Sequence, residues 1–161
     1  EYIRALPPET FVDTLIDYFE LIKWHPVRFA HEGLYDLATS IQERIEKLAD
    51  VPKLVDWLFD DVLPDETDEK EIRKIAKAMS VDKVTDVLDL AVEELEKCTW
   101  DEATISETIN GIGHKLETKS QVPIRIAVTG RRVGLPLFKP MELLGRQKVL
   151  ERLRKARAGM G

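Results

Sequence analysis

The sequence has little cysteine and no long apolar run, and each shortage removes a class of protein. Cys98 is the single cysteine among 161 residues, so an internal disulfide is impossible. This usage predicts a reducing, cytoplasmic setting. No apolar run approaches the roughly 18–20 residues that a membrane-spanning helix needs. The composition therefore argues against a disulfide-rich or membrane-spanning protein.

Recognisable catalytic and metal-binding patterns are also missing. His25, His31, His114 and Cys98 do not fall at the spacings of a metal site. No P-loop occurs, and no Ser/His/Asp arrangement stands out. The acidic stretch 60–71 is interpreted as a solvated link between two subdomains rather than a cation site. We therefore expect no metal site and no catalytic residue in this chain.

The charge that is present is distributed unevenly. Residues 121–161 contain ten Lys/Arg and two Glu, a net charge of +8, so residues 1–120 carry −14 within the chain total of −6. A strongly basic segment in an acidic protein indicates local binding of a polyanion. The basic residues of this segment are Arg125, Arg131, Arg132, Lys139, Arg146, Lys148, Arg152, Arg154, Lys155 and Arg157.

The apolar periodicity predicts an all-α protein of two packed helical subdomains, residues 1–62 and 63–161. Predicted helices cover residues 8–23, 34–48, 53–59, 72–79, 81–95, 100–116 and 141–158. Pro8 suits a first helical position, Ser80 an N-cap, and Thr99 opens a capping-box pattern. The last helix should carry its Arg and Lys residues on the face opposite its leucines. Only residues 124–128 have strand-like composition, and one isolated strand would have no partner.

Three short sequence motifs stand out in the basic segment. They are Ile124–Gly130 (IRIAVTG), Pro136–Phe138 (PLF) and Glu142–Arg146 (ELLGR). Bacterial glutamyl-tRNA synthetase, a class I aminoacyl-tRNA synthetase, has I-R-x-A-[LV]-T-G, P-L-F and E-L-L-G-[KR] in this order. Residues 1–4 are similar to the segment that follows its KMSKS loop. The chain thus resembles the C-terminal anticodon-binding region of that family along essentially its whole length, and we expect it to be a fragment.

The resemblance implies an α-helical cage that binds the anticodon loop of glutamate tRNA, and it favours a helix at residues 124–128. The expected partner is tRNA, with no DNA, no membrane and a monomeric state. ATP and magnesium would serve the full-length ligase in protein biosynthesis, whereas this fragment is expected to need no cofactor and to be inactive alone.

The resemblance also implies a role for several residues. Arg44, seven positions before Val51, would read the third anticodon base, which is C for glutamate and G for glutamine. An alternative is an ordinary solvated arginine paired with a neighbour on its helix. Arg125 would stack on or contact anticodon bases. The pocket for the first base would consist of Gly134, Leu135, Pro136 and Leu137, and phosphate contacts would come from Arg131 and Arg132.

The sequence also admits other interpretations. Gly111–His114 resembles the HIGH signature and Lys77–Ser80 the KMSKS loop, but both matches are broken and their order is reversed. A helical protein-interaction module without RNA binding remains an alternative, as does a parent enzyme that also charges glutamine tRNA. Many relatives carry a hydroxyl residue and a proline where this chain has Gly134 and Leu135, which removes one expected side-chain hydrogen bond.

Overall fold

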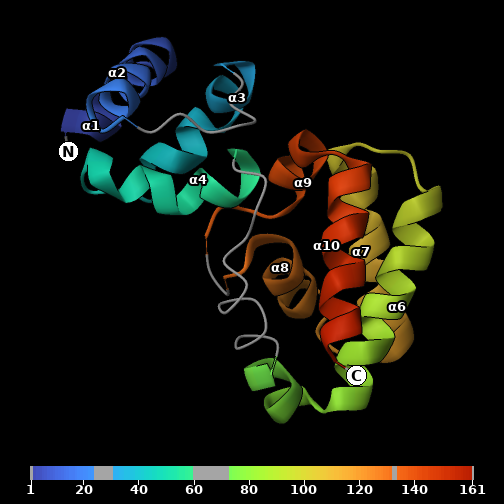
Figure 1. The fold of residues 1–161 in the computed structure, drawn as a ribbon. Helices are drawn as coiled ribbons and strands as arrows, with labels where there is room; N and C mark the ends of the chain where they lie inside the picture. Colours follow the sequence, from blue (N-terminus) through green and yellow to red (C-terminus); the bar gives the residue numbers. More distant parts are fainter. Residues whose placement is uncertain (1, 24–30, 60–72, 132–133, 161) are drawn as a thin grey trace. The chain divides into compact units, whose positions relative to one another are not determined.

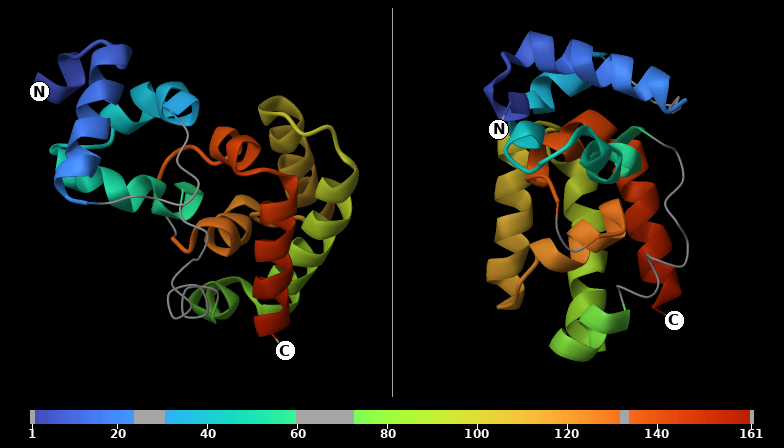
Figure 2. Two further views of the ribbon diagram at one scale, coloured as in Figure 1. Left: turned by 45° about the horizontal axis from the view of Figure 1, so that its top comes forward. Right: turned by 90° about the vertical axis from the view of Figure 1, so that its left-hand side faces the viewer.

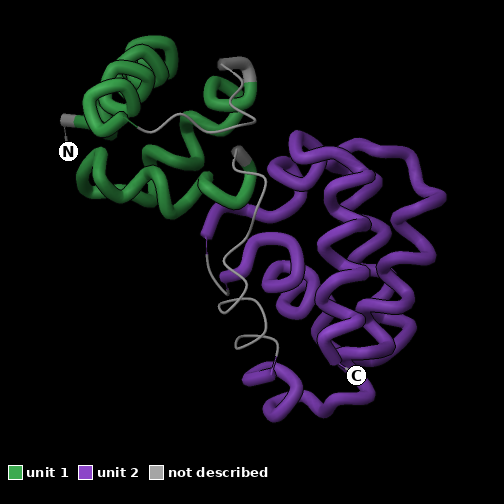
Figure 3. The backbone as a smooth tube through the Cα atoms, viewed as in Figure 1, with its two compact units in different colours: residues 1–62 green, residues 63–161 purple. Residues whose placement is uncertain are grey.

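The computed structural model describes residues 2–23, 31–59, 73–131 and 134–160, and every regular element in these ranges is a helix. This confirms the predicted all-α class. The chain divides into two compact units, Glu1–Val62 and Leu63–Gly161 (Figure 3). No helix in the described ranges has both the length and the apolar character needed to cross a membrane. The acidic stretch 60–71 lies outside the described residues.

The first unit is built from short helices. In chain order they are α1 (Tyr2–Ala5), α2 (Pro8–Leu21), α3 (His31–Gln42), the 3₁₀ helix η1 (Leu48–Asp50) and α4 (Val51–Phe59). Helix α2 begins at Pro8 as predicted, where a missing N–H leaves no hydrogen bond unmade. Its apolar face buries Phe11, Val12, Leu15 and Phe19, and it packs against α3. Local helix chemistry and one amphipathic seam thus account for this unit.

Helix α3 is shorter than predicted, because it ends at Gln42 and not at residue 48. The Gln42 side chain is buried, and its Nε2 donates to the carbonyl oxygens of Ile3 at 3.0 Å and Leu6 at 2.9 Å. The carboxylate of Asp50 accepts two backbone N–H groups from the turn that follows. The Asp50 carboxylate therefore satisfies two N–H groups, those of Glu46 and Lys47, that a continued α3 would have bonded within the helix.

The second unit is a helical bundle. Its elements are α6 (Val81–Lys97), α7 (Glu102–Leu116), α8 (Gln121–Thr129), α9 (Phe138–Leu144) and α10 (Arg146–Gly159), and residues 73–79 are also helical. Helix α6 packs against both α7 and α10, and these three lie side by side in Figures 1 and 2. Helix α8 contacts α6, α7 and α10, which places it against the core of the bundle.

Two N-caps fix the starts of α6 and α7. The Ser80 hydroxyl accepts the N–H of Lys83 at 3.2 Å, as the sequence predicts. Helix α7, in contrast, is capped by Asp101 and not by Thr99, with Oδ1 of Asp101 accepting the N–H of Thr104 at 2.7 Å. A carboxylate at the N-cap also complements the helix dipole, which favours the later start.

The last predicted helix is in fact two helices. The helix is interrupted at Gly145. Its φ of 98° and ψ of 150° are accessible to glycine and strained for other residues. Residues 138–144 form α9 before the break, and α10 begins directly after it. Apolar periodicity alone does not reveal this break, because the leucine spacing on the two sides remains compatible with one helix.

Candidate nucleic-acid interface

Residues 124–128 form part of helix α8, as the resemblance implies and against their strand-like composition. Ile124, Ile126, Ala127 and Val128 are all fully buried, so apolar contacts outweigh the modest helix propensity of β-branched residues. Pro123 is the third residue of the helix, a position where an N–H would have no intrahelical partner, so the missing N–H of proline leaves no bond unmade. Gly130 caps the C-terminal end of the helix: it has a φ of 76° and donates its N–H to the Ile126 carbonyl at 2.8 Å.

Arg125 connects α8 to the segment that precedes α9. Its side chain is partly buried, and Nη1 donates to the carbonyl oxygen of Leu135 at 2.7 Å. The two residues are ten positions apart, so this hydrogen bond spans most of the α8–α9 connection. The structure therefore brings together two of the predicted anticodon-binding positions.

Residues 134–137, named here the 134–137 segment, combine buried and exposed positions. The side chains of Leu135 and Leu137 are each only 2% exposed, so they pack inside the unit. Pro136 between them is exposed, and Gly134 is half-buried. Any base held at this segment would accordingly meet backbone groups, Gly134 and Pro136, rather than the two leucine side chains.

The turn after α8 is held by Thr129. Its hydroxyl accepts the N–H of Arg131 at 3.1 Å and donates to the carbonyl of the same residue at 3.0 Å. Arg131 is half-buried. Arg132, the second predicted phosphate contact, lies outside the described residues.

Arg44 lies in the turn beyond the end of α3, and not on a helix as the sequence predicted. It is exposed, and its Nη1 donates to the Ser40 carbonyl at 2.9 Å. The same nitrogen is 3.6 Å from the carboxylate of Glu43. These contacts are local and face solvent, so a new partner can replace them at small energetic expense.

Much of the positive charge of the C-terminal segment is used inside the second unit. Arg157 of α10 pairs with Asp89 of α6 at 2.8 Å, and Arg154 lies 3.8 Å from Glu96 of the same helix. The acidic helix and the basic helix are therefore electrostatically complementary. The net charge of +8 overstates the charge that this segment offers to a polyanion.

Arg152 contradicts the prediction that the basic residues of the last helix share an outer face. Its side chain is only 6% exposed, and Nη1 donates to the carbonyl of Val128 at 2.8 Å. That carbonyl belongs to the last turn of α8, where intrahelical donors run out. A cation at this end also complements the helix dipole. Arg152 thus stabilises the C-terminal end of α8.

Sequence reasoning missed a cluster formed by Trp100, Glu142 and Arg146. The Trp100 indole N–H donates to the Glu142 carbonyl at 3.3 Å, and the Arg146 guanidinium lies over the indole ring, 5.4 Å from its centre. Arg146 also donates to the carbonyl of Cys98. The ELLGR motif carried the signal, because its Glu and Arg flank the Gly145 break, but spacing alone does not reveal Trp100 as their partner.

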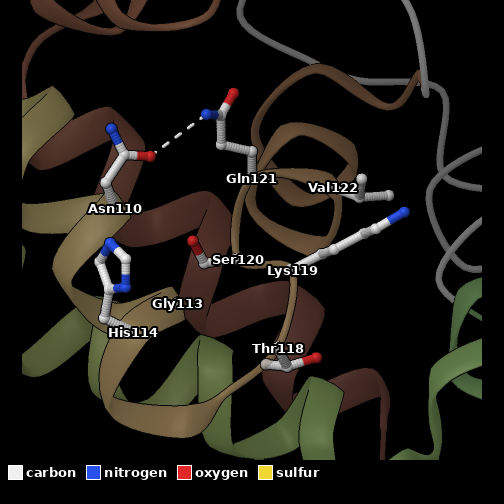
Figure 4. Close-up of a pocket in the computed structure, with 8 residues that line it drawn as sticks. All are labelled: Asn110, Gly113, His114, Thr118, Lys119, Ser120, Gln121 and Val122. Carbon is white, nitrogen blue, oxygen red and sulfur yellow. Dashed lines mark hydrogen bonds between the residues drawn. The ribbon is translucent and has the colours of Figure 1, made fainter.

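A surface pocket of about 490 Å³ lies where α7 meets α8 (Figure 4). Gln121 donates to Asn110 across it at 3.3 Å, whereas the Ser120 hydroxyl turns inward to the Ile109 carbonyl at 2.7 Å. The lining residues are Asn110, Gly113, His114, Thr118, Lys119, Ser120, Gln121 and Val122. None of them is a predicted anticodon-binding residue, and the titratable ones, His114 and Lys119, are exposed.

Within the described ranges, no group of three or more His, Cys, Asp or Glu side chains is placed to hold a metal ion. The resolved pKa shifts belong to helix caps. The N–H of Thr104, and then its hydroxyl, lower the pKa of Asp101 below its ordinary 3.8. In the first unit, the N–H of Glu46 lowers the pKa of Asp50, with further help from Lys47. These carboxylates stabilise turns and are not poised for acid–base chemistry.

Comparison with known families gives the class of this chain. A family model described as "Anticodon binding domain" matches residues 10–157, and the chain therefore belongs to the anticodon-binding domain family.

The relatives found in curated sequences are glutamate–tRNA ligases. The chain is 40% identical to that of Thermobifida fusca over 97% of this chain and 33% of that protein. It is 38% identical to that of Salinispora tropica over 98% of this chain and 35% of that protein. It is 35% identical to that of Frankia casuarinae over 98% of this chain and 33% of that protein. The chain thus spans about a third of the length of these relatives.

A solved structure shares the fold. The crystal structure of a glutamate tRNA ligase from Elizabethkingia meningosepticum, in complex with its amino acid, superposes with a TM-score of 0.77 at 14% identity. The match covers 99% of this chain and 31% of that one. At this identity the comparison establishes the architecture.

Proposed function

We propose that this chain is the anticodon-binding region of a bacterial glutamate–tRNA ligase and that it binds the anticodon loop of glutamate tRNA. The observation that carries the proposal is the family match along residues 10–157. Similarity to glutamate–tRNA ligases over nearly the whole chain supports the choice of tRNA. Ligation, with its ATP and magnesium, belongs in this proposal to the remainder of the parent enzyme.

The second unit would hold the first part of the anticodon. Arg125 presents a planar cation beside the 134–137 segment, and guanidinium groups stack well on unpaired bases. The exposed Pro136 and half-buried Gly134 leave room for a base to approach the backbone. Arg131 and Arg132 would add phosphate contacts, which strengthen binding without specifying sequence.

The first unit would supply the reading of the third base through Arg44. Guanidinium donors match the acceptors of cytosine, whereas the Watson–Crick edge of guanine presents donors of its own. The exposed position of Arg44 and its weak local contacts support this role, because its donors can turn to a base with little loss. Glutamate tRNA, with C at that position, would be preferred over glutamine tRNA.

Binding to an anticodon stem-loop across a salt series tests the proposal. Phosphate contacts release counterions, so the affinity for a glutamate-tRNA stem-loop should fall steeply as KCl rises. A stem-loop of the same length with an unrelated anticodon is the control and should bind more weakly at every salt concentration. Equal affinity for both loops would reject anticodon recognition, and no binding at low salt would favour a protein-interaction module.

Catalysis is tested separately. The chain contains no residue set for adenylate formation, so purified protein should not support glutamate-dependent exchange between ATP and pyrophosphate. Exchange above that of a buffer control would contradict the assignment of these residues to an anticodon-binding region.

A further inference from the structure

The 134–137 segment is fixed to α8 by a side chain, and not by helix or sheet bonds. Arg125 donates to the Leu135 carbonyl at 2.7 Å, while the buried Leu135 and Leu137 side chains anchor the segment in the core. Pro136 has no N–H, so it cannot contribute a backbone donor of its own. The guanidinium is thus a principal hydrogen-bonding support of this short stretch.

Helix α8, which carries Arg125, is itself held in place by its packing. Its neighbours Ile124 and Ile126 are fully buried, and α8 packs against three other helices. At the far end, Arg152 holds the Val128 carbonyl at 2.8 Å. A side chain that extends from such a helix transmits a fixed position to whatever it bonds, because the helix has little freedom to follow a displaced loop.

The geometry also limits how the guanidinium is used. One nitrogen, Nη1, is engaged by the Leu135 carbonyl and lies 3.8 Å from the position that a Cβ on Gly134 would occupy. The group therefore bonds to Leu135 and lies beside Gly134. Removing it would leave the carbonyl of a buried residue without this donor and would open space beside Gly134.

We infer that Arg125 is a positioning residue for RNA binding, which holds the 134–137 segment in its binding conformation through the Leu135 carbonyl. The inference rests on the proposed function, because it assigns a cause to the affinity of that same site. It distinguishes two uses of one arginine. A phosphate contact would add charge-dependent affinity, whereas a positioning contact adds affinity that is independent of salt. Stacking of Arg125 on a base would also be independent of salt, but its loss would leave the conformation of the RNA-free segment unchanged.

The test compares Arg125→Met and Arg125→Lys with the unaltered chain. Arg125→Met should weaken binding to a glutamate-tRNA anticodon stem-loop about ten-fold at every KCl concentration, with the slope of log K against log salt unchanged. Arg125→Lys retains a donor and should recover part of the affinity. In the absence of RNA, Arg125→Met should speed hydrogen exchange at the amides of residues 134, 135 and 137, and leave exchange in α10 unchanged.

Arg157→Met is the matched control. It removes the same charge from the same unit, but Arg157 pairs with Asp89 of α6. Amide exchange at residues 134, 135 and 137 should equal that of the unaltered chain in this variant. A slope reduced by about one in Arg125→Met would make Arg125 a phosphate contact and overturn the inference. Unchanged exchange at residues 134–137 would overturn it as well. Failure of the unaltered chain to bind RNA would instead reject the proposed function, since the exchange measurement needs no RNA.

Discussion

Arg44 in the first unit and Arg125 in the second have related proposed roles but opposite local environments. Arg44 is exposed in a turn and, among the residues that the structure describes, bonds to neighbours four residues away or closer. Arg125 extends from a buried helix and bonds to a residue ten positions further along the chain. The first arginine is available to a partner, whereas the second already supports the protein.

The different hydrogen-bond partners of Arg44 and Arg125 suggest how to distinguish a residue that reads a base from one that supports the binding site. An arginine that reads a base must exchange its present hydrogen bonds for new ones, which is easiest where those bonds face water. An arginine that supports a loop should keep its bonds when RNA arrives. Two arginines with related proposed roles can therefore act in physically different ways.

The largest expected effect concerns Arg152, whose side chain is buried in the second unit. Arg152→Leu should lower the free energy of unfolding by about 2–3 kcal/mol, because it removes a charged donor and leaves a buried carbonyl unsatisfied. Urea denaturation followed by circular dichroism measures the loss. Arg157→Leu on the same helix breaks only a partly exposed ion pair with Asp89 and should change stability by less than about 1 kcal/mol. Equal losses in the two variants would show that burial does not separate these arginines.

The second prediction concerns Arg44, the exposed arginine of the first unit. Arg44→Gln should narrow the preference for C over G at the third anticodon base by roughly ten-fold, since a matched polar contact to a base is worth about 1–3 kcal/mol. Thermal stability should be unaffected. Competition between stem-loops that differ only at this base provides the measurement. Glu43→Gln removes the carboxylate beside Arg44 without removing the guanidinium, and it should keep the preference. An unchanged ratio in Arg44→Gln would leave Arg44 a solvated arginine.

The third prediction uses one helix-capping aspartate from each unit. Asp50 and Asp101 both have folded-state pKa values below the ordinary 3.8, so each carboxylate stabilises the fold above its unfolded pKa. This contribution is lost as the pH falls through the folded-state pKa. Asp101→Ala should therefore destabilise the chain most at neutral pH, and the difference from the unaltered chain should shrink towards pH 3.

Amide hydrogen exchange shows which unit responds. Asp101→Ala should speed exchange at the start of α7, and Asp50→Ala should do so in η1 and the start of α4. A pH-independent difference between variant and unaltered chain would contradict the role of the charged carboxylate. A response of both units to either variant would mean that the units are energetically coupled.

The smallest expected effect is that of Gly134→Ser. A Cβ at this position would meet Arg125 Nη1 at 3.8 Å, an ordinary contact, so stability should change by less than about 0.5 kcal/mol. The new hydroxyl adds a hydrogen-bonding group to the proposed pocket for the first anticodon base, so preference at that base should shift. Gly111→Ser, placed on α7 with nothing within 4 Å, is the control for the added hydroxyl. A change at the third base instead would contradict the assignment of this segment.

The sequence predicted the helical class and several helix starts because these depend on local chemistry. Pro8 and Ser80 act where the sequence places them, since a first-turn proline and an N-cap hydroxyl work within a few residues. The ends of α3 and α9 were not predicted. The last residue of α3, Gln42, is buried and bonds to residues 36 and 39 positions away, and no local pattern contains these contacts.

The candidate site was only partly accessible to sequence reasoning. The resemblance identified Arg125 and the 134–137 segment, and the structure adds that they are joined by a hydrogen bond. Counting charges predicted a uniformly basic outer face for the last helix, but Arg152 is buried and Arg154 and Arg157 face acidic residues of α6. Net charge is a simple sum over the sequence. Whether a charged side chain remains available to a partner depends on the residues that the fold packs beside it.

The backbone conformation at Gly145, between α9 and α10, favours one enantiomer of an amino acid over the other. Nothing lies within 4 Å of the position that a Cβ would take there, so space does not exclude a side chain. The exclusion comes from the φ of 98° and ψ of 150°, a conformation that L-residues avoid and that lies close to the mirror image of their extended region. A D-alanine introduced at position 145 by chemical synthesis should therefore fit the junction of α9 and α10, where its L-enantiomer would be strained. The position selects for chirality and not for size.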